Sequence, residues 1–142
     1  MPAPRRFAED TNETYLRQAF AMAEEAIANG NPPFGAALVK DGQVIARTPN
    51  TAHTDHNISH HAETNCLGAA ARKLGYWGLE GSTLYSSCEP CEMCCELIFL
   101  TGVKKLVYGL SAERFAKITG FRKAISAKTY FNFANDKVEV VG

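Results

Sequence analysis

The chain has 142 residues and is 46% hydrophobic, which suits a single domain that buries its own core without disulfide bonds. Its 15 basic and 15 acidic residues cancel, and this balance excludes the strong overall positive charge with which many proteins attract nucleic acid or anionic membrane. Since no apolar stretch reaches the roughly 20 residues of a membrane span and no signal-peptide core follows Arg5 and Arg6, we expect one domain over residues 1–142, in the cytoplasm and without a membrane partner.

Capping, turn and breaker residues divide the chain into short helices and strands. The first helix is expected to begin at a capping-box pattern, Asp10 with Glu13, and to stop at Gly30. Asp41 and Gly42 separate the first two strands, and this dipeptide is typical of a tight antiparallel hairpin. In chain order, the expected elements are a helix at 10–29, strands at 34–39 and 44–46, a polar loop at 48–59, a helix at 61–74, a strand at 82–86, a helix at 91–100, a strand at 105–108, a basic and partly helical region at 111–128, and a last strand at 138–141.

This order of helices and strands favours a sheet covered by helices, an α/β sandwich. Two groups of side chains near the C-terminus have open interpretations. A basic group can contact RNA phosphates or form a solvated helix face, and an aromatic group can stack on a planar ring or close the core. The basic residues are Arg114, Lys117, Arg122, Lys123 and Lys128, and the aromatic residues are Tyr130, Phe131 and Phe133.

Four of the five cysteines crowd between Cys88 and Cys95, where disulfide bonds are hard to arrange, and this crowding favours a metal site. Zinc accepts imidazole nitrogen and thiolate sulfur, and a catalytic zinc site has three protein ligands with a fourth position open to water. His61, Cys91 and Cys94 provide such a set. His61 and Cys91 also fall at predicted helix starts, where the helix dipole favours thiolates. We therefore predict one zinc ion per chain.

Glu63 follows His61 by two positions and is the predicted catalytic residue. A carboxylate beside the metal can accept a proton from water, protonate the ring nitrogen next to the amine-bearing carbon, and return a proton to departing ammonia. Residues two apart on a regular helix point to different sides. The side chains of His61 and Glu63 therefore converge only if the site lies at the first turn of the helix.

Cys88 leaves two other metal sites open. It extends the spacing to Cys-x-x-Cys-x-x-Cys, which resembles part of an iron–sulfur ligand run but leaves His61 and Glu63 unexplained. Cys88 can also be a fourth zinc ligand, which would close the site. The protein would then be a structural zinc module without catalysis.

Residues 61–63 (His-Ala-Glu) and 88–94 (Cys-Glu-Pro-Cys-Glu-Met-Cys) match the H-x-E and P-C-x-x-C signature of zinc nucleobase deaminases. With residues 33–36 (Pro-Phe-Gly-Ala) upstream, the chain resembles the cytidine deaminase-like superfamily. It is most similar to the guanine deaminase and tRNA adenosine deaminase branches, over about residues 16–109. The resemblance implies a zinc-dependent hydrolytic deaminase that acts on a nitrogen heterocycle.

The same resemblance implies a three-layer α/β sandwich with a mixed five-stranded sheet, a homodimer or larger homo-oligomer, and one catalytic zinc per subunit. It further implies that Asn50, Phe34 and Ala62 contact the substrate. Asn50 is equally suited to a turn, and Phe34 has an alternative place in the core.

The heterocycle itself stays open, with guanine as the first candidate among small free substrates. Guanine deaminases, however, carry acidic residues just after the counterparts of Gly120 and Phe121, where this chain has Arg122 and Lys123. The nearest alternative is deamination of adenosine in tRNA, which requires contacts with the RNA backbone. The balanced overall charge favours the small substrate.

Overall fold

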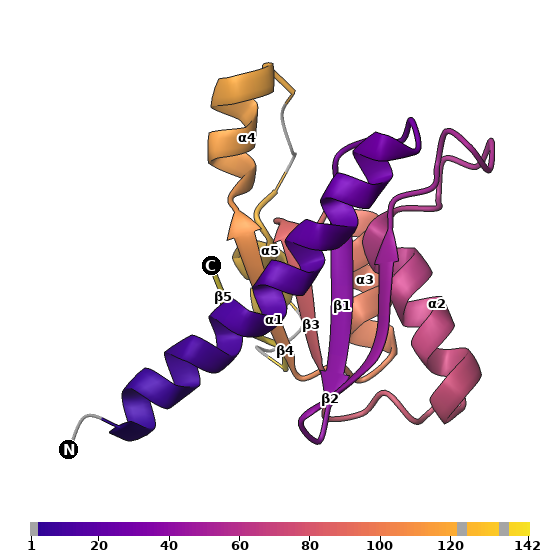
Figure 1. Cartoon of the computed structure of the whole chain (residues 1–142). Helices are drawn as coiled ribbons and strands as arrows, with labels where there is room; N and C mark the ends of the chain where they lie inside the picture. Colours follow the sequence, from indigo (N-terminus) through magenta and orange to yellow (C-terminus); the bar gives the residue numbers. More distant parts are fainter. Residues whose placement is uncertain (1–2, 122–124, 134–136) are drawn as a thin grey trace.

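The computed structural model describes residues 3–121, 125–133 and 137–142. They form a sheet with helices on both faces, so the predicted three-layer α/β sandwich is confirmed. Figure 1 shows α1 lying across one face and α2, α3 and α5 on the opposite face, while α4 extends beyond the end of β4. In chain order, the elements are α1 (Ala3–Ala28), β1 (Gly35–Lys40), β2 (Gln43–Pro49), α2 (Ala62–Leu74), β3 (Thr83–Cys88), α3 (Glu92–Leu100), β4 (Lys105–Leu110), α4 (Ala112–Thr119), α5 (Ala127–Phe133) and β5 (Glu139–Val141).

The sheet is mixed, as predicted, and over the described residues it has five strands in the order β2-β1-β3-β4-β5. β1 runs antiparallel to both β2 and β3, whereas β4 runs parallel to β3 and β5. Cys88 at the end of β3 is paired with Leu110 at the end of β4. The segments that follow these two parallel strands therefore start at the same edge of the sheet, and this edge carries the candidate site.

The predicted hairpin between β1 and β2 is confirmed. Asp41 and Gly42 both have positive φ, 52° and 75°, as a two-residue turn matched to the twist of the strands requires. Lys40 pairs with Gln43 across this turn. The hairpin places the end of β2 beside the start of β1, close to the loop that leads to α2.

Both faces of the interior strand β1 are covered, and residues 35–39 are all buried. On one face, Ala37 and Val39 pack with Ala19 of α1. The fit is close at Gly35, because a Cβ atom there would lie 2.2 Å from the carbonyl oxygen of Ala19. The opposite face packs on α2, α3 and α5 and contains the larger cluster of buried residues.

The predicted start of the first helix was wrong, and each strand differs from its predicted bounds by one to three residues at one or both ends. α1 begins at Ala3, so the helix passes through Asp10 and no helix start forms there. The reason lies in residues 3–9, which are mostly good helix formers with a proline near the start, where proline is tolerated. The last strand begins at Glu139, one residue later than expected.

The C-terminal region contains two short helices, α4 and α5, with the aromatic residues on the second. Phe131 is buried in the larger core cluster and Tyr130 packs against it. The hydroxyl of Tyr130 donates to the Glu96 carboxylate on α3. These two rings therefore close the core, which was one of the two interpretations. Arg122, Lys123 and the side chain of Phe133 lie outside the described part.

Among the described residues, no helix has both the length and the apolar character that crossing a membrane requires.

Candidate active site

His61 and Cys91 occupy equivalent positions, each immediately before the first residue of a helix, α2 and α3. Their backbones are extended there, with φ −71° and ψ 161° at His61 and φ −75° and ψ 173° at Cys91, and neither side chain caps its own helix. Both side chains are thus available ahead of the helix starts. Cys94, one turn into α3 and buried, joins them.

The three candidate ligand atoms form a nearly equilateral triangle. His61 Nδ1 lies 3.6 Å from Cys91 Sγ and 3.6 Å from Cys94 Sγ, and the two sulfur atoms are 3.7 Å apart. Tetrahedral zinc with ordinary bond lengths separates two sulfur ligands by about 3.8 Å and a sulfur from a nitrogen by about 3.6 Å. The triangle therefore fits zinc without movement of the side chains. Within the described ranges, these three residues form the only cluster of side chains that is arranged to hold a metal ion.

The protein groups themselves favour negative sulfur at this point. The hydrogen bond with Cys94 lowers the pKa of Cys91 to about 4, and His61 contributes in the same direction against the effect of burial. The thiolate of Cys91 in turn raises the pKa of His61, and the hydrogen bond with Cys91 together with burial raises that of Cys94. A thiolate beside a second cysteine and an imidazole is a donor set that suits a zinc ion.

Glu63 lies in the first turn of α2 and is only 6% exposed. Burial raises the pKa of its carboxyl to about 7, and the negative charge of Cys91 acts in the same direction, against a hydrogen bond to its own backbone and the charge of His61. A carboxyl with such a pKa can both accept and release a proton near neutrality.

A cavity of about 380 Å³ is lined by His61 and Cys91 of the ligand triangle and by Glu63. One wall is aromatic, with the rings of Phe34 and Phe115 5.6 Å apart and those of Phe115 and Phe121 6.5 Å apart. The remaining wall is formed largely by the loop from β3 to α3. The lining residues are Phe34, His61, Glu63, Cys88, Glu89, Cys91, Glu92, Ala112, Phe115 and Phe121.

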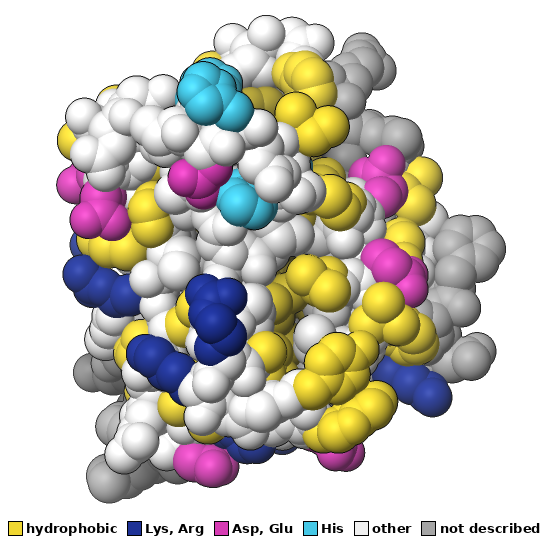
Figure 2. Space-filling model, turned by 90° about the vertical axis from the view of Figure 1, so that its right-hand side faces the viewer, with side chains coloured by type: hydrophobic (Ala, Val, Ile, Leu, Met, Phe, Trp, Pro, Cys, Tyr) yellow, Lys and Arg dark blue, Asp and Glu magenta, His cyan; other side chains and the backbone are white. Residues whose placement is uncertain are grey.

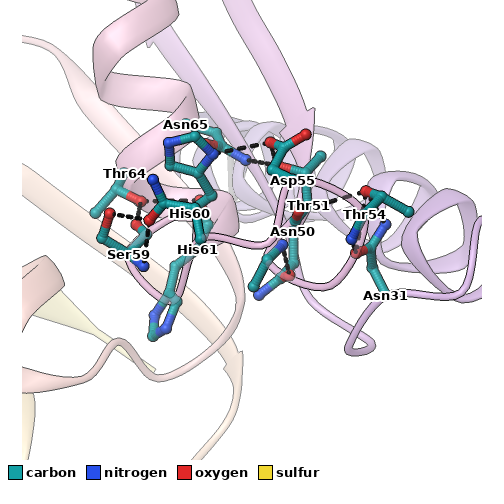
Figure 3. A network of polar contacts seen from close by, with 12 residues as sticks. Asn31, Asn50, Thr51, Thr54, Asp55, Ser59, His60, His61, Thr64 and Asn65 are labelled. Carbon is teal, nitrogen blue, oxygen red and sulfur yellow. Dashed lines mark hydrogen bonds and ion pairs between the residues drawn. The ribbon is translucent and has the colours of Figure 1, made fainter.

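The loop between β2 and α2 is held by a dense polar network (Figure 3). Asn31, at the end of the first helix region, accepts the backbone N–H groups of His53 and Thr54 at 3.0 Å. From the other side, Asn65 of α2 donates to the Pro49 carbonyl at 3.0 Å and to the Thr51 hydroxyl at 2.9 Å. The loop that leads to His61 is therefore held by the segment that follows α1 and by α2.

The family model of the cytidine and deoxycytidylate deaminase zinc-binding region matches residues 9–110. The chain belongs to this family. The predicted superfamily is thereby confirmed, and the match, together with the ligand triangle, confirms that the chain carries a zinc site of the kind found in these deaminases.

Relatives of this family with different names are similar to the chain. The tRNA-specific adenosine deaminase of Bacillus subtilis is 41% identical over 98 residues, which are 69% of this chain and 61% of that protein. The probable cytosine deaminase of Schizosaccharomyces pombe is 32% identical over 90% of this chain and 81% of its own length. The solved guanine deaminase of Bacillus subtilis superposes with a TM-score of 0.74, at 36% identity, over 79% of this chain and 71% of that one.

Of the three residues that the family resemblance implies in substrate contact, Phe34 is among those that line the cavity, whereas Asn50 and Ala62 are not. Asn50 is 3% exposed and lies beside Phe34, because its backbone N–H donates to the Phe34 carbonyl at 2.9 Å, while its side-chain oxygen accepts the Ala52 N–H at 2.8 Å. Ala62 is fully buried as the first residue of α2, and its carbonyl accepts the Thr48 hydroxyl at 2.9 Å.

The sequence predicted no role for five lining residues: Glu89, Glu92, Ala112, Phe115 and Phe121. All belong to the segments that follow the parallel strands β3 and β4. Once those strands are known to be neighbours, their following segments must meet at one edge of the sheet. The sheet topology therefore predicts that these residues lie at the site, whereas the residue spacing within the motif does not.

Proposed function

We propose that this chain is a zinc-dependent hydrolytic deaminase that replaces the exocyclic amine of a small nitrogen heterocycle by a carbonyl oxygen and releases ammonia. The observation that carries the proposal is the buried carboxyl of Glu63, which lines the same cavity as His61 and Cys91. In this proposal His61, Cys91 and Cys94 hold the zinc, and Glu63 is the catalytic residue.

Bound zinc supplies the Lewis acidity that makes water a nucleophile at neutral pH. The carboxylate of Glu63 accepts the proton of the attacking water and passes it to the ring nitrogen next to the amine-bearing carbon. The same carboxylate then takes the second proton of that water from the new hydroxyl group on the carbon and delivers it to the amine. The carbonyl forms as the C–N bond breaks, so one water is consumed and one ammonia leaves. The position of Glu63 supports this shuttling, because its buried carboxyl lines the cavity together with His61 and Cys91.

The lining of the cavity favours a free base over a phosphate-bearing substrate. Its aromatic wall, formed by Phe34, Phe115 and Phe121, suits a planar ring. Its charged lining residues include the carboxylates Glu89 and Glu92, and no lysine or arginine lines it among the described residues. Phosphate oxygens would meet repulsion there. Guanine is the first compound to test and cytosine the second. The alignments with this chain cover 71% of the solved guanine deaminase and 81% of the probable cytosine deaminase.

Three residues are proposed to hold the base. Phe34 stacks on its ring, and Asn50, hydrogen-bonded to the Phe34 backbone, reads a polar edge from the same side. Ala62 offers its backbone N–H, since the first N–H groups of a helix have no acceptor within the helix.

An ammonia-release screen of the zinc-loaded protein tests the proposal. The compounds are guanine, cytosine, adenine, their nucleosides and nucleoside monophosphates. We expect turnover of one free base and at least a tenfold lower kcat/KM, roughly, for its monophosphate. No ammonia from any compound, with zinc bound at one per chain, would instead support a structural zinc module.

Deamination of adenosine in tRNA is the second candidate, favoured by 41% identity to the Bacillus subtilis enzyme. On α4, however, Lys117 is paired with Glu113 at 3.5 Å, which weakens this surface as a phosphate contact. Binding of tRNA whose affinity falls steeply with salt, together with inosine formation, would support this candidate and contradict the free-base proposal.

The proposal includes a homodimer, formed through the face that carries α2 and α3. A groove of about 720 Å³ lies between these helices, and Met93 and Leu100 of α3 line it while exposed. Figure 2 shows hydrophobic side chains gathered around a hollow on this side of the molecule. Ile58, 92% exposed in the loop before His61, would also be covered by a second copy. Sedimentation tests the dimer, and a monomer with full activity at nanomolar concentration would contradict it.

A reducing compartment such as the cytoplasm is also part of the proposal. Five free cysteines are found, two of them proposed as zinc ligands, and oxidising conditions would compete with metal for these thiols.

A further inference from the structure

The carboxylate of Glu89 is bound to the beginnings of two helices at once. Its Oε1 accepts the backbone N–H of Ala112 at 2.9 Å, and its Oε2 accepts that of Ala127 at 2.7 Å. Its own backbone N–H donates to the carbonyl of Leu110 at 2.8 Å. One residue, two positions before Cys91, therefore ties the zinc-binding loop to β4, α4 and α5.

The two hydrogen bonds to the Glu89 carboxylate come from backbone amides at helix starts. Ala112 and Ala127 are the first residues of α4 and α5, and the first N–H groups of a helix have no acceptor within it. A carboxylate is the preferred acceptor at that position, because the helix dipole is positive there and the hydrogen bonds are charge-assisted. Ser111 caps α4 separately by accepting the N–H of Arg114 at 3.1 Å. Glu89 thus serves an N–H group that the cap does not reach.

α4 depends on such contacts because the core does not hold it. None of its residues is buried, although Ala112 and Phe115 line the cavity. A short helix without buried side chains is marginally stable by itself. The hydrogen bond from Ala112 to Glu89 fixes the start of α4 directly against the loop that carries Cys91. This hydrogen bond therefore fixes the position of the Phe115 ring over the cavity relative to the metal site.

We propose that Glu89 is a positioning residue, which holds α4, and with it the aromatic wall of the cavity, in place over the zinc site. It acts through Ala112 and Phe115 and does not itself take part in proton transfer. The catalytic part of this inference rests on the proposed deaminase function, whereas the coupling of Glu89 to α4 and α5 does not.

The test uses the zinc-loaded protein with Glu89→Gln, and Glu113→Gln as the matched control. Both changes remove one carboxylate near the start of α4, but Glu113 is exposed, and its ion pair among the described residues is with Lys117 on the same helix. Three quantities are measured for each variant: zinc content, the hydrogen-exchange rates of the Ala112 and Ala127 amides, and the KM and kcat for the base found in the ammonia screen.

For Glu89→Gln we expect full zinc, exchange at one or both amides faster by about tenfold, and KM raised by about tenfold with kcat changed little. Glu113→Gln should leave all these quantities near their wild-type values. Glu89→Ala, which removes both acceptors, should accelerate exchange at both amides. If Glu89→Gln folds poorly, Glu89→Asp replaces it. Aspartate keeps the charge, but its side chain is one carbon too short to bridge both helices. The Glu89→Asp variant should therefore show the same faster hydrogen exchange at one of the two amides.

Unchanged exchange at both amides would overturn the coupling, whatever the activity does. A fall in kcat with unchanged KM and unchanged exchange would make Glu89 a catalytic residue and overturn the positioning role. If the wild-type protein deaminates none of the compounds, the proposed function fails, and the exchange rates still decide whether Glu89 holds α4.

Discussion

The rings of Phe34 and Phe115 lie 5.6 Å apart at an angle of 52°, although one precedes β1 and the other belongs to α4. This contact joins two segments that are far apart in the sequence, in one wall of the cavity that Glu63 also lines. Phe34 is held from the rigid hairpin, whereas Phe115 belongs to a helix without buried residues. The aromatic wall thus has one fixed side and one side whose position depends on α4.

Replacement of Phe115 by alanine is expected to weaken substrate binding. Stacking of a base on an aromatic side chain contributes on the order of 1–3 kcal/mol, so KM should rise roughly 5- to 150-fold, with kcat affected less. Steady-state kinetics with the active base measure both quantities. Trp77→Ala is the control, since that ring is 78% exposed and does not line the cavity. Equal kinetics in the two variants would show that the Phe115 ring does not contact the substrate.

Two glycine substitutions should change stability in opposite directions. In Gly35→Ala, the added Cβ would lie 2.2 Å from the Ala19 carbonyl oxygen and 2.3 Å from the Ala23 nitrogen, both backbone atoms of α1. α1 must shift away from β1, and we expect a loss of at least about 2 kcal/mol in the free energy of unfolding.

Gly68→Ala is the counterpart on α2, where the nearest atom to the new Cβ is the end of Arg72 at 3.6 Å, an ordinary contact. Alanine loses less backbone entropy in a helix, so stability should rise by about 0.5–1 kcal/mol. Urea unfolding of the zinc-loaded proteins measures both changes. A Gly35→Ala protein as stable as the wild type would contradict the close approach of α1 to the sheet.

The cysteines should react with iodoacetamide in a defined order once zinc is removed. The pKa of Cys91 is lowered to about 4, so above that pH its thiolate predominates and alkylation is expected already at pH 6. Burial raises the pKa of Cys66 to about 12, so this thiol stays protonated and protected up to pH 9. Peptide mass spectrometry after timed labelling identifies the sites. Zinc added before labelling should protect Cys91, and rapid labelling of Cys66 would indicate that the metal-free chain had unfolded.

Local patterns predicted most of the fold and the metal site. The Asp41-Gly42 turn specifies its hairpin through backbone geometry, and the P-C-x-x-C motif places Cys91 and Cys94 on one face of a helix start. The doubtful point was whether His61 and Glu63, two residues apart, can reach one site. They do, because His61 is not yet helical and its extended backbone turns the side chain toward the cavity lined by Glu63.

The remaining features depend on contacts between distant segments. The roles of Glu89 and Phe115 follow from the parallel pairing of β3 with β4, which no local pattern encodes. The start of α1 was misplaced because a local pattern was present but did not decide the structure. The capping pattern at Asp10 is real in the sequence, but a helix that begins earlier satisfies the same backbone groups. The choice between guanine, cytosine and tRNA adenosine depends on side chains around the cavity and beyond it, so the motif does not decide it.

Glu63→Gln and His61→Ala should separate proton transfer from metal binding. Glutamine keeps the size of Glu63 but cannot accept and return a proton, so zinc should stay bound at one per chain while kcat falls by at least roughly 10²–10⁴-fold. His61→Ala removes a corner of the ligand triangle, so zinc and activity should be lost together, with a lower unfolding temperature because binding of the metal also stabilises the fold. Zinc analysis, ammonia release and thermal unfolding on both variants measure these effects. Near wild-type turnover by Glu63→Gln would contradict the mechanism, and full zinc in His61→Ala would remove His61 from the metal site.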